Sequence, residues 1–436
     1  MKELLSITKM NELRELALKL GKNARNASSQ MYSVKTVRKN DVLRRISDCI
    51  EKNKINIFQG NALDLEIAKK SKKDSAFLDR LEITNKSIHD MCNGLEQVAS
   101  LPDPIGTISN LMEQPSGIKV GNMNVPIGVI LMIYESRPNV TVDAAALTLK
   151  TGNAIILRGG SESINSNVVL HTIFHDMLKK CNVPANSVQL AKETNRDLVK
   201  ALLLLDKYID IVIPRGGKSL IERISKDSKI QVIKHLDGIC HVYIDEFADK
   251  KRAIDITVNS KTQRLGTCNT LETLLVNRKI AEKILPLICK SLLEKNVEIR
   301  VCKLTKRILS EKKFPALKKI KVATNKDWAT EYLDAILSIK TVAGLDEAIA
   351  HISTYGSSHT ESIVTENHEN AMNFLRRVDS SSVMVNTSTR FADGFQYGLG
   401  AEIGISTNKL HARGPVGLEG LTTKKWIVMS DGQVRN

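Results

Sequence analysis

One cysteine of the sequence lies in a setting that suits a nucleophile. Cys268 stands at a polar junction of small residues, where an expected helix ends and an apolar run at 274–276 begins. Gly266, two residues earlier, would leave room for another molecule to approach the sulfur. A thiolate is a strong nucleophile, and its pKa responds to helix termini and to cations. The alternative is a buried structural thiol, which is the commoner role of a free cysteine.

Two arginine–glycine turns are candidates for binding a phosphate. Arg158-Gly159-Gly160-Ser161 and Arg215-Gly216-Gly217 each follow an apolar run and precede a helix-like segment. A glycine turn with a cation before the N-terminus of a helix can bind an anion. Either one alone could be a tight turn with an incidental arginine, but two at one edge of a sheet favour a nucleotide phosphate.

Other patterns match known motifs only in part. Gly217-Lys218-Ser219 ends like a P-loop, but Val212 stands where the first glycine of that motif would be. His171 and His175 have the spacing of a zinc-protease helix without the adjacent glutamate. The seven cysteines form no C-x-x-C pair, which argues for reduced thiols and against a disulfide scaffold or a zinc site. We expect no metal.

Length and composition indicate a globular protein of two or three domains. The chain has 436 residues, of which 42% are hydrophobic and 26% charged. No apolar run approaches the roughly 20 residues that span a bilayer, and no signal peptide is evident, so we expect a cytoplasmic protein without a membrane partner. The net charge of +16 raises nucleic-acid binding as a rival function, but dispersed lysines and 4% aromatic residues argue against it.

Strands and helices alternate after a largely helical region at residues 1–100. Apolar runs at 127–134, 154–158 and 209–214 are typical of strands buried on both faces. Each run is followed by a turn and a helix-like segment, an order that predicts a doubly wound parallel sheet. Ligands bind such sheets at the carboxyl ends of the strands, where both arginine–glycine turns would lie.

A second α/β unit is expected from residue 240 onward. Its first strand is predicted at 240–244, and the helix predicted at 252–264 leads to Cys268. Polar and apolar residues alternate at 117–125, which indicates an extended hairpin, and 422–429 has the pattern of an extended arm.

With Cys268 placed in this second unit, the chain resembles the aldehyde dehydrogenase superfamily. Within it, the chain is most similar to the γ-glutamyl phosphate reductase (glutamate-5-semialdehyde dehydrogenase) family. It departs from that family at 393–397, where a glycine-rich run ending in phenylalanine is more usual. The matching runs cover the chain nearly end to end and are Val125-Pro126-Ile127-Gly128-Val129, Tyr134-Glu135-Ser136-Arg137-Pro138-Asn139, Ile213-Pro214-Arg215-Gly216-Gly217, Cys268-Asn269-Thr270-Leu271-Glu272-Thr273-Leu274-Leu275, Thr330-Glu331-Tyr332-Leu333-Asp334, Tyr355-Gly356-Ser357-Ser358-His359-Thr360-Glu361, Asn386-Thr387-Ser388-Thr389-Arg390-Phe391, Gly398-Leu399-Gly400-Ala401-Glu402-Ile403-Gly404 and His411-Ala412-Arg413-Gly414-Pro415.

The resemblance implies an α/β fold with two doubly wound parallel-sheet domains and a β oligomerisation arm. Residues 1–111 and 127–236 would form the NADP-binding domain, and residues 237–413 the catalytic domain that carries the cysteine. Residues 112–126 and 414–436 would form the oligomerisation hairpin and arm. A homodimer or homotetramer is therefore expected.

The implied activity is NADPH-dependent reduction of L-glutamyl 5-phosphate to L-glutamate 5-semialdehyde and phosphate, the second step of proline biosynthesis from glutamate. Cys268 would attack the acyl phosphate and form a thioester, which a hydride then reduces. Some relatives are fused to a glutamate 5-kinase, so a separate kinase that channels its product to this chain is an expected partner. The alternative activity is that of an oxidising NAD(P) aldehyde dehydrogenase acting on another semialdehyde.

The resemblance also implies cofactor contacts. NAD-preferring relatives carry a carboxylate after the second strand, whereas this chain has Arg158 and no carboxylate before Glu162, which favours NADPH. The two arginine–glycine turns would bind the cofactor, and Glu331 would hold the nicotinamide ribose unless it is a surface carboxylate. Hydrolytic relatives need a carboxylate base. His235 takes its place here, with Asp237 nearby, which fits an enzyme that must not hydrolyse its thioester.

The developing oxyanion needs hydrogen-bond donors. The backbone amide of Cys268 would be one, and the turn at Ser136 would supply the other, where relatives place an asparagine. Arg137 could instead bind the leaving phosphate. Further candidates for substrate binding lie in two of the matching runs: Asn386, Arg390 and Arg413. A planar guanidinium matches phosphate and carboxylate alike, but each arginine could equally be a structural ion-pair partner.

Overall fold

The computed structural model describes residues 2–234 and 236–435, which form two compact units. Unit 1 comprises residues 1–234, 398–405 and 415–436, and unit 2 comprises residues 235–397 and 406–414. Each unit has its own parallel sheet and its own hydrophobic core. The α/β fold with two such sheets, expected from the order of strands and helices, is therefore confirmed.

The sheet of unit 1 is parallel throughout, with the strand order β5-β4-β3-β6-β7. The apolar run at 129–134 forms β3, whose six residues are all buried, because helices cover both faces of the sheet. The strands are β3 (Val129–Tyr134), β4 (Ala154–Gly159), β5 (Val188–Leu190), β6 (Ile211–Arg215) and β7 (Gln231–Val232). The helices between them are α6 (Asn139–Lys150), η1 (Ser161–Ser163), α7 (Ile164–Lys180), η2 (Ala185–Ser187), α8 (Arg196–Leu202) and α9 (Lys218–Asp227).

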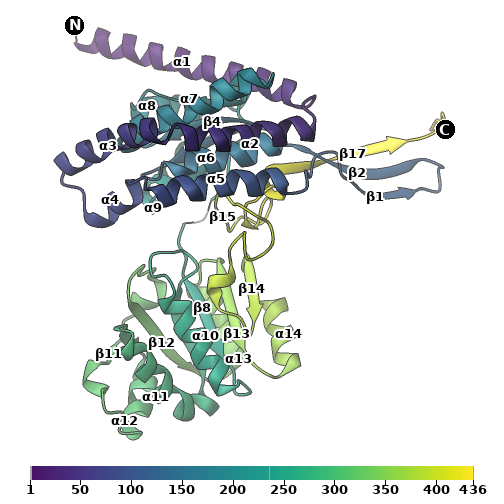
Figure 1. Cartoon of the computed structure of the whole chain (residues 1–436). Helices are drawn as coiled ribbons and strands as arrows, with labels where there is room; N and C mark the ends of the chain where they lie inside the picture. Colours follow the sequence, from purple (N-terminus) through teal and green to yellow (C-terminus); the bar gives the residue numbers. More distant parts are fainter. Residues whose placement is uncertain (1, 235, 436) are drawn as a thin grey trace. The chain divides into compact units, whose positions relative to one another are not determined.

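Five helices precede this sheet, as predicted for residues 1–100. Small and apolar side chains of α1, such as Ala17 and Ala24, pack in the same core as Val129 and Leu131 of β3. Helices α2 and α5 lie against one another in the same unit (Figure 1). The five helices are α1 (Lys2–Met31), α2 (Thr36–Lys52), α3 (Lys54–Lys70), α4 (Ser75–Leu81) and α5 (Asn85–Ser100).

A three-stranded antiparallel sheet extends from the helices of unit 1 (Figure 1). Its strands are β1 (Ile108–Glu113), β2 (Lys119–Pro126) and β17 (Thr422–Met429), and β2 lies in the middle. The predicted hairpin at 117–125 is therefore one strand and not two. Its partner at 108–113 was missed because five of those six residues are exposed, so that no apolar face marks the strand.

The sheet of unit 2 is also parallel, with the order β11-β10-β12-β9-β8-β13-β14. Strand β9 is buried over its whole length, which matches its central position. The strands are β8 (Cys240–Ile244), β9 (Leu271–Asn277), β10 (Glu298–Val301), β11 (Lys321–Val322), β12 (Ile336–Val342), β13 (Thr360–Val364) and β14 (Ser382–Val385). The helices are α10 (Lys250–Thr262), α11 (Arg278–Glu294), α12 (Lys303–Glu311), η3 (Leu317–Lys319), η4 (Asp327–Ala329), α13 (Leu345–Tyr355), α14 (His368–Arg377) and η5 (Thr389–Phe391).

The remaining short elements are β15 (Ile405–Ser406), β16 (Gly414–Pro415) and η6 (Glu419–Leu421). None of the helices in the described part of the chain is long and apolar enough to cross a membrane.

Candidate active site

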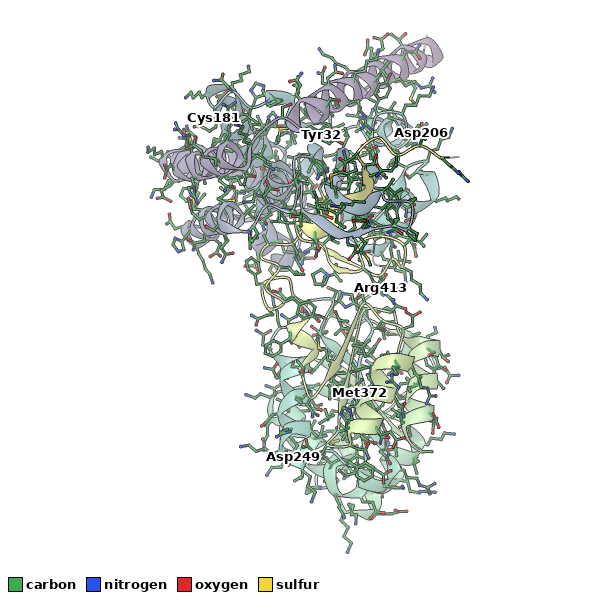
Figure 2. The ribbon with its side chains drawn as sticks, turned by 90° about the vertical axis from the view of Figure 1, so that its right-hand side faces the viewer. Tyr32, Cys181, Asp206, Asp249, Met372 and Arg413 are labelled. Atoms are coloured by element: carbon green, nitrogen blue, oxygen red, sulfur yellow. The ribbon has the colours of Figure 1, made fainter. Side chains whose placement is uncertain are left out.

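Cys268 lies in a tight turn between α10 and β9, and its side chain is half-buried. The turn is closed by its own hydrogen bonds. The backbone N–H of Thr270 donates to the carbonyl oxygen of Thr267 at 3.0 Å, and the Thr270 hydroxyl donates to that of Arg264 at 2.7 Å. Helix α10 begins at a firm cap, where the N–H of Arg252 donates to Asp249 at 2.8 Å (Asp249 is labelled in Figure 2). The thiol is therefore carried by a well-anchored segment.

Gly238, just before β8, and Cys240, its first residue, support the backbone of Cys268. A Cβ on Gly238 would stand 2.0 Å from the Cys268 carbonyl oxygen, so only glycine fits at this position. The thiol of Cys240 donates to the same oxygen at 3.2 Å. Burial raises the pKa of Cys240 well above its ordinary value, and Glu361 raises it further. Cys240 is thus held as a neutral thiol, while Cys268 is the more accessible of the two.

Two arginines of unit 2 interact electrostatically with one another, and one of them, Arg390, also interacts with Cys268. The Nε–H of Arg390 donates to Gln263 at 2.8 Å, which fixes the guanidinium beside the end of α10. Burial lowers the pKa of Arg390, and the nearby charge of Arg264 lowers it further, whereas Cys268 raises it. Arg264 was missed by the sequence reasoning, although its place four residues before the cysteine could have drawn attention to it. Together the two guanidinium groups suit an anionic substrate.

The other predicted residues of unit 2 are held by protein contacts. Glu331 accepts a hydrogen bond from the N–H of Gly238 at 2.9 Å, which brings it to the same backbone that supports Cys268. The side-chain amide of Asn386 donates to the Thr365 carbonyl at 2.8 Å, and its oxygen accepts from the Thr365 N–H at 2.9 Å. These two bonds connect the ends of β13 and β14.

Arg413, labelled in Figure 2, forms an ion pair with Asp379 at 2.5 Å. The guanidinium is half-buried, and Lys409 contacts the other oxygen of the same carboxylate. Hydrogen bonds from Lys409 and Arg413 hold the pKa of Asp379 below its usual value. His235 lies outside the described residues, and Asp237 is half-buried just before Gly238.

Unit 1 has a pocket of about 470 Å³ at the carboxyl ends of β3 and β4. Helices α8 and α9 contribute to its walls. Its lining includes the predicted cofactor residues Arg158, Gly160 and Ser161, and three further cations that the sequence reasoning missed: Arg196, Lys200 and Arg223. Arg158 donates to the carbonyl oxygens of Gly159 and, at 2.6 Å, Thr194. Its Nε is buried and has no hydrogen-bond partner among the described residues.

Two carboxylates accept hydrogen bonds from turns that were predicted to bind ligands. Glu135 accepts the N–H of Gly217 at 3.0 Å, at the N-terminus of α9. Glu162 accepts both the N–H of Ser136, at 2.9 Å, and its hydroxyl, at 3.0 Å. Ser136 has a positive φ of 49°, and the half-buried Arg137 follows it. Arg215 ends β6, and its backbone carbonyl accepts the N–H of Glu135 at 3.0 Å.

The residues of unit 1 fit a dinucleotide phosphate better than any metal. A buried guanidinium N–H without a partner, further cations in the same pocket and a helix N-terminus are all donors suited to phosphate. In the described part of the chain, no three His, Cys, Asp or Glu side chains gather as metal ligands.

Comparison with known proteins agrees with this arrangement. A model of the aldehyde dehydrogenase family matches residues 8–301, and the chain belongs to this family. It is similar over its whole length to γ-glutamyl phosphate reductases of known structure, as the sequence motifs indicated. With the enzyme from Thermotoga maritima it shares 42% identity over 96% of this chain and 100% of that one, with a TM-score of 0.92. With the enzyme from Saccharomyces cerevisiae it shares 35% identity over 96% and 98%, with a TM-score of 0.52.

A more distant likeness concerns the fold alone. The glyceraldehyde-3-phosphate dehydrogenase from Methanocaldococcus jannaschii, solved as a complex with NADP, is 16% identical over 96% of this chain and 95% of that one, with a TM-score of 0.64.

Proposed function

We propose that the protein is an NADPH-dependent glutamate-5-semialdehyde dehydrogenase, which reduces L-glutamyl 5-phosphate to L-glutamate 5-semialdehyde and phosphate in proline biosynthesis. The observation that carries the proposal is the half-buried Cys268 thiol, which interacts electrostatically with Arg390, in a chain 42% identical to a γ-glutamyl phosphate reductase over 96% of its length. Unit 2 is the catalytic unit, and unit 1 binds the cofactor.

The first step is attack of the Cys268 thiolate on the acyl carbon. A C–S bond forms, the C–O bond to the phosphate breaks, and inorganic phosphate leaves with the bonding electron pair. The backbone N–H of Cys268 stabilises the developing oxyanion, and the turn at Ser136 is the proposed second donor. Because Glu162 holds both donor groups of Ser136 in the structure, this role requires Glu162 to release them.

Positive charge beside the thiol binds the anionic ends of the substrate. Arg390, which a hydrogen bond to Gln263 holds in place, presents a planar fork that matches a phosphate or a carboxylate. Arg137 and Arg413 remain candidates for the other anionic group, and Arg413 would share its guanidinium with Asp379. Asn386 acts by holding the ends of β13 and β14 together, four residues before Arg390.

The cofactor is NADPH, whose nicotinamide supplies the hydride that reduces the thioester. Arg158, Gly159, Gly160 and Ser161 receive the adenosine ribose phosphate, and Arg215, Gly216 and Gly217 receive the pyrophosphate. The cations that line the pocket of unit 1 support a 2′-phosphate. Glu331 positions the nicotinamide ribose through one carboxylate oxygen while it accepts the N–H of Gly238.

The proposal also covers assembly and location. The arm strand β17 exposes Trp426 and Val428, and β1 exposes Met112, so the arm sheet offers apolar surface to a second copy of the chain. The enzyme acts as a homo-oligomer and receives its substrate from a glutamate 5-kinase. All seven cysteines are free thiols, which suits the reducing cytoplasm.

The test is oxidation of pyrroline-5-carboxylate, which is in equilibrium with the semialdehyde, by NADP⁺ with and without inorganic phosphate. We expect phosphate-dependent NADPH formation that Cys268→Ala abolishes and that Cys181→Ala, a half-buried cysteine after α7, leaves unchanged. Equal turnover without phosphate would instead identify a hydrolytic aldehyde dehydrogenase. Full activity of Cys268→Ala would refute the role of this thiol.

A further inference from the structure

A fully buried ion pair lies beneath the turn that carries Cys268. Lys261, in the last turn of α10, and Glu272, in β9, both have side chains with 0% exposure, and their Nζ and Oε2 atoms are 2.7 Å apart. Removing two charges from water is costly, and apolar residues would often stabilise the same site as well or better. A buried pair of this kind therefore calls for a role other than stability.

The second oxygen of Glu272 holds a loop. Its Oε1 accepts the backbone N–H of Leu333 at 3.2 Å. Leu333 has a φ of +52°, an unfavourable conformation for a bulky residue, and its side chain is exposed, so apolar packing does not account for this conformation. The ammonium of Lys261 lies 5.9 Å from the ring of Tyr332, whose hydroxyl is hydrogen-bonded to Asp327 at 2.7 Å. Glu272 and Lys261 thus anchor two consecutive residues of this loop.

The anchored residues directly follow Glu331. Its Oε1 accepts the N–H of Gly238 at 2.9 Å, and Gly238 lies so close to Cys268 that an added Cβ would stand 2.0 Å from the Cys268 carbonyl oxygen. Contacts therefore run from the buried pair through the Leu333 loop to Glu331, and from there to the backbone of the cysteine turn.

We infer that the Lys261–Glu272 pair is a positioning device that sets Glu331 and the Gly238 backbone relative to Cys268. The inference rests on the proposed function, in which Glu331 and Cys268 take part in the same reaction. Neither member of the pair touches substrate or cofactor, and each acts through the loop at 331–333. Loss of the pair should therefore change the use of NADPH and the reactivity of the thiol more than it changes the fold.

The groups around the pair give it a dependence on pH. Glu272 faces Lys261, the N–H of Leu333 and the carboxylate of Glu331, while Lys261 also faces Asp334 and the thiol of Cys240. Burial raises the pKa of Glu272 to about 7, against the opposing effect of Lys261. Because a carboxylate is ionised above its pKa, the ion pair is progressively lost as the pH falls through that value.

The first experiment measures steady-state kinetics of Glu272→Gln, Lys261→Arg and the double variant Lys261→Met with Glu272→Leu. The apolar double variant leaves no stray buried charge and should fold. We expect the KM for NADPH of the double variant to rise about tenfold, since Glu331 loses its support. In Lys261→Arg, which keeps the positive charge, the KM for NADPH should stay close to the wild-type value. The KM of wild type should also rise below pH 7, and this rise should be missing in Glu272→Gln. Asp346→Asn, which removes an exposed ion pair with Arg377, is the matched control.

A second measurement does not depend on the identity of the substrate. We expect iodoacetamide to alkylate Cys268 about threefold faster in the apolar double variant than in wild type, because the Gly238 backbone is less firmly held. A folded double variant with wild-type alkylation rate and wild-type KM would overturn the inference. Failure of the proposed function would appear separately, as an absence of phosphate-dependent turnover in wild type, and the alkylation rates would still decide the positioning role.

Discussion

The thiol of Cys240 donates a hydrogen bond to the carbonyl oxygen of Cys268 over 3.2 Å. A buried cysteine at the start of β8 thus contacts the turn that carries the half-buried one. The buried Cys240 serves as a hydrogen-bond donor whose pKa is raised by burial, and the half-buried Cys268 keeps its sulfur available. The same carbonyl faces Gly238, so the backbone of Cys268 is held by the Cys240 thiol at the start of β8 and by a glycine just before that strand.

Adding a single methyl group at Gly238 should lower both the stability and the activity of the protein. In Gly238→Ala the new Cβ would stand 2.0 Å from the Cys268 carbonyl oxygen, so the turn must move. We expect a loss of about 3 kcal/mol in the free energy of unfolding, as in an overpacked core, together with most of the activity. Gly266→Ala is the control, because no atom lies within 4 Å of its added Cβ. Denaturant melts measure the stability of the two variants, and rate assays measure their activity. Equal values for Gly238→Ala and Gly266→Ala would contradict this close packing against Cys268.

Arg390 should bind the anionic substrate. Removing its charge in Arg390→Gln should cost about 2 kcal/mol of a charge-assisted hydrogen bond and raise the KM of the substrate roughly thirtyfold. The KM for NADPH should stay near the wild-type value, since the pocket proposed for the cofactor lies in unit 1. Arg377→Gln, which removes an exposed arginine paired with Asp346, serves as control. An unchanged substrate KM in Arg390→Gln would assign this arginine to structure alone.

Arg158 should set the preference for NADPH. Its buried Nε lacks a partner among the described residues and is available to a phosphate oxygen. In Arg158→Gln we expect the KM for NADPH to rise about tenfold while the KM for NADH changes little, because only the phosphorylated ribose needs the cation. Parallel assays with the two cofactors provide an internal control. Equal losses with both would show that Arg158 acts by holding Gly159 and Thr194 rather than by contacting the 2′-phosphate.

Two buried histidines should make the fold sensitive to acid. Burial lowers the pKa of His351 to about 3 and that of His359 to about 4, from an ordinary 6.5. Below 6.5 the unfolded chain binds protons that the folded chain does not, so the free energy of unfolding falls with pH by up to about 1.4 kcal/mol per unit for each histidine. Urea melts between pH 7.5 and 5 should show this slope, and His351→Phe should reduce it. If His351→Phe showed the same pH slope as wild type, other groups than His351 would be responsible for the pH dependence.

The sheets could be predicted because their signals are local, and Cys268 could be proposed as a nucleophile for the same reason. The run from Val129 to Tyr134 is apolar at every position, which only a strand covered on both faces requires. Cys268 stood out through its small neighbours and the run of family residues around it. The strand at 108–113 was missed because it lies in an exposed arm, where no burial imposes an apolar pattern.

Much of the site depends on contacts between residues far apart in the sequence. Glu162 meets Ser136 across 26 positions, and Glu135 meets Gly217 across 82. A carboxylate near a phosphate turn gives no sign in the sequence of whether its oxygens face that turn. The ion pair of Arg413 with Asp379 spans 34 positions. For the same reason, the sequence left open whether Arg413 binds the substrate or forms a structural ion pair. Such contacts form only when the sheets and helices pack together, so the sequence alone does not show them.

The most direct test is to trap the thioester on Cys268. The enzyme is mixed with the semialdehyde and NADP⁺ in the absence of phosphate, digested, and analysed by mass spectrometry. We expect one glutamyl group on the peptide that contains Cys268, formed together with one NADPH and released when phosphate is added. NADPH formation without any adduct on that peptide, or an adduct on another cysteine, would contradict it.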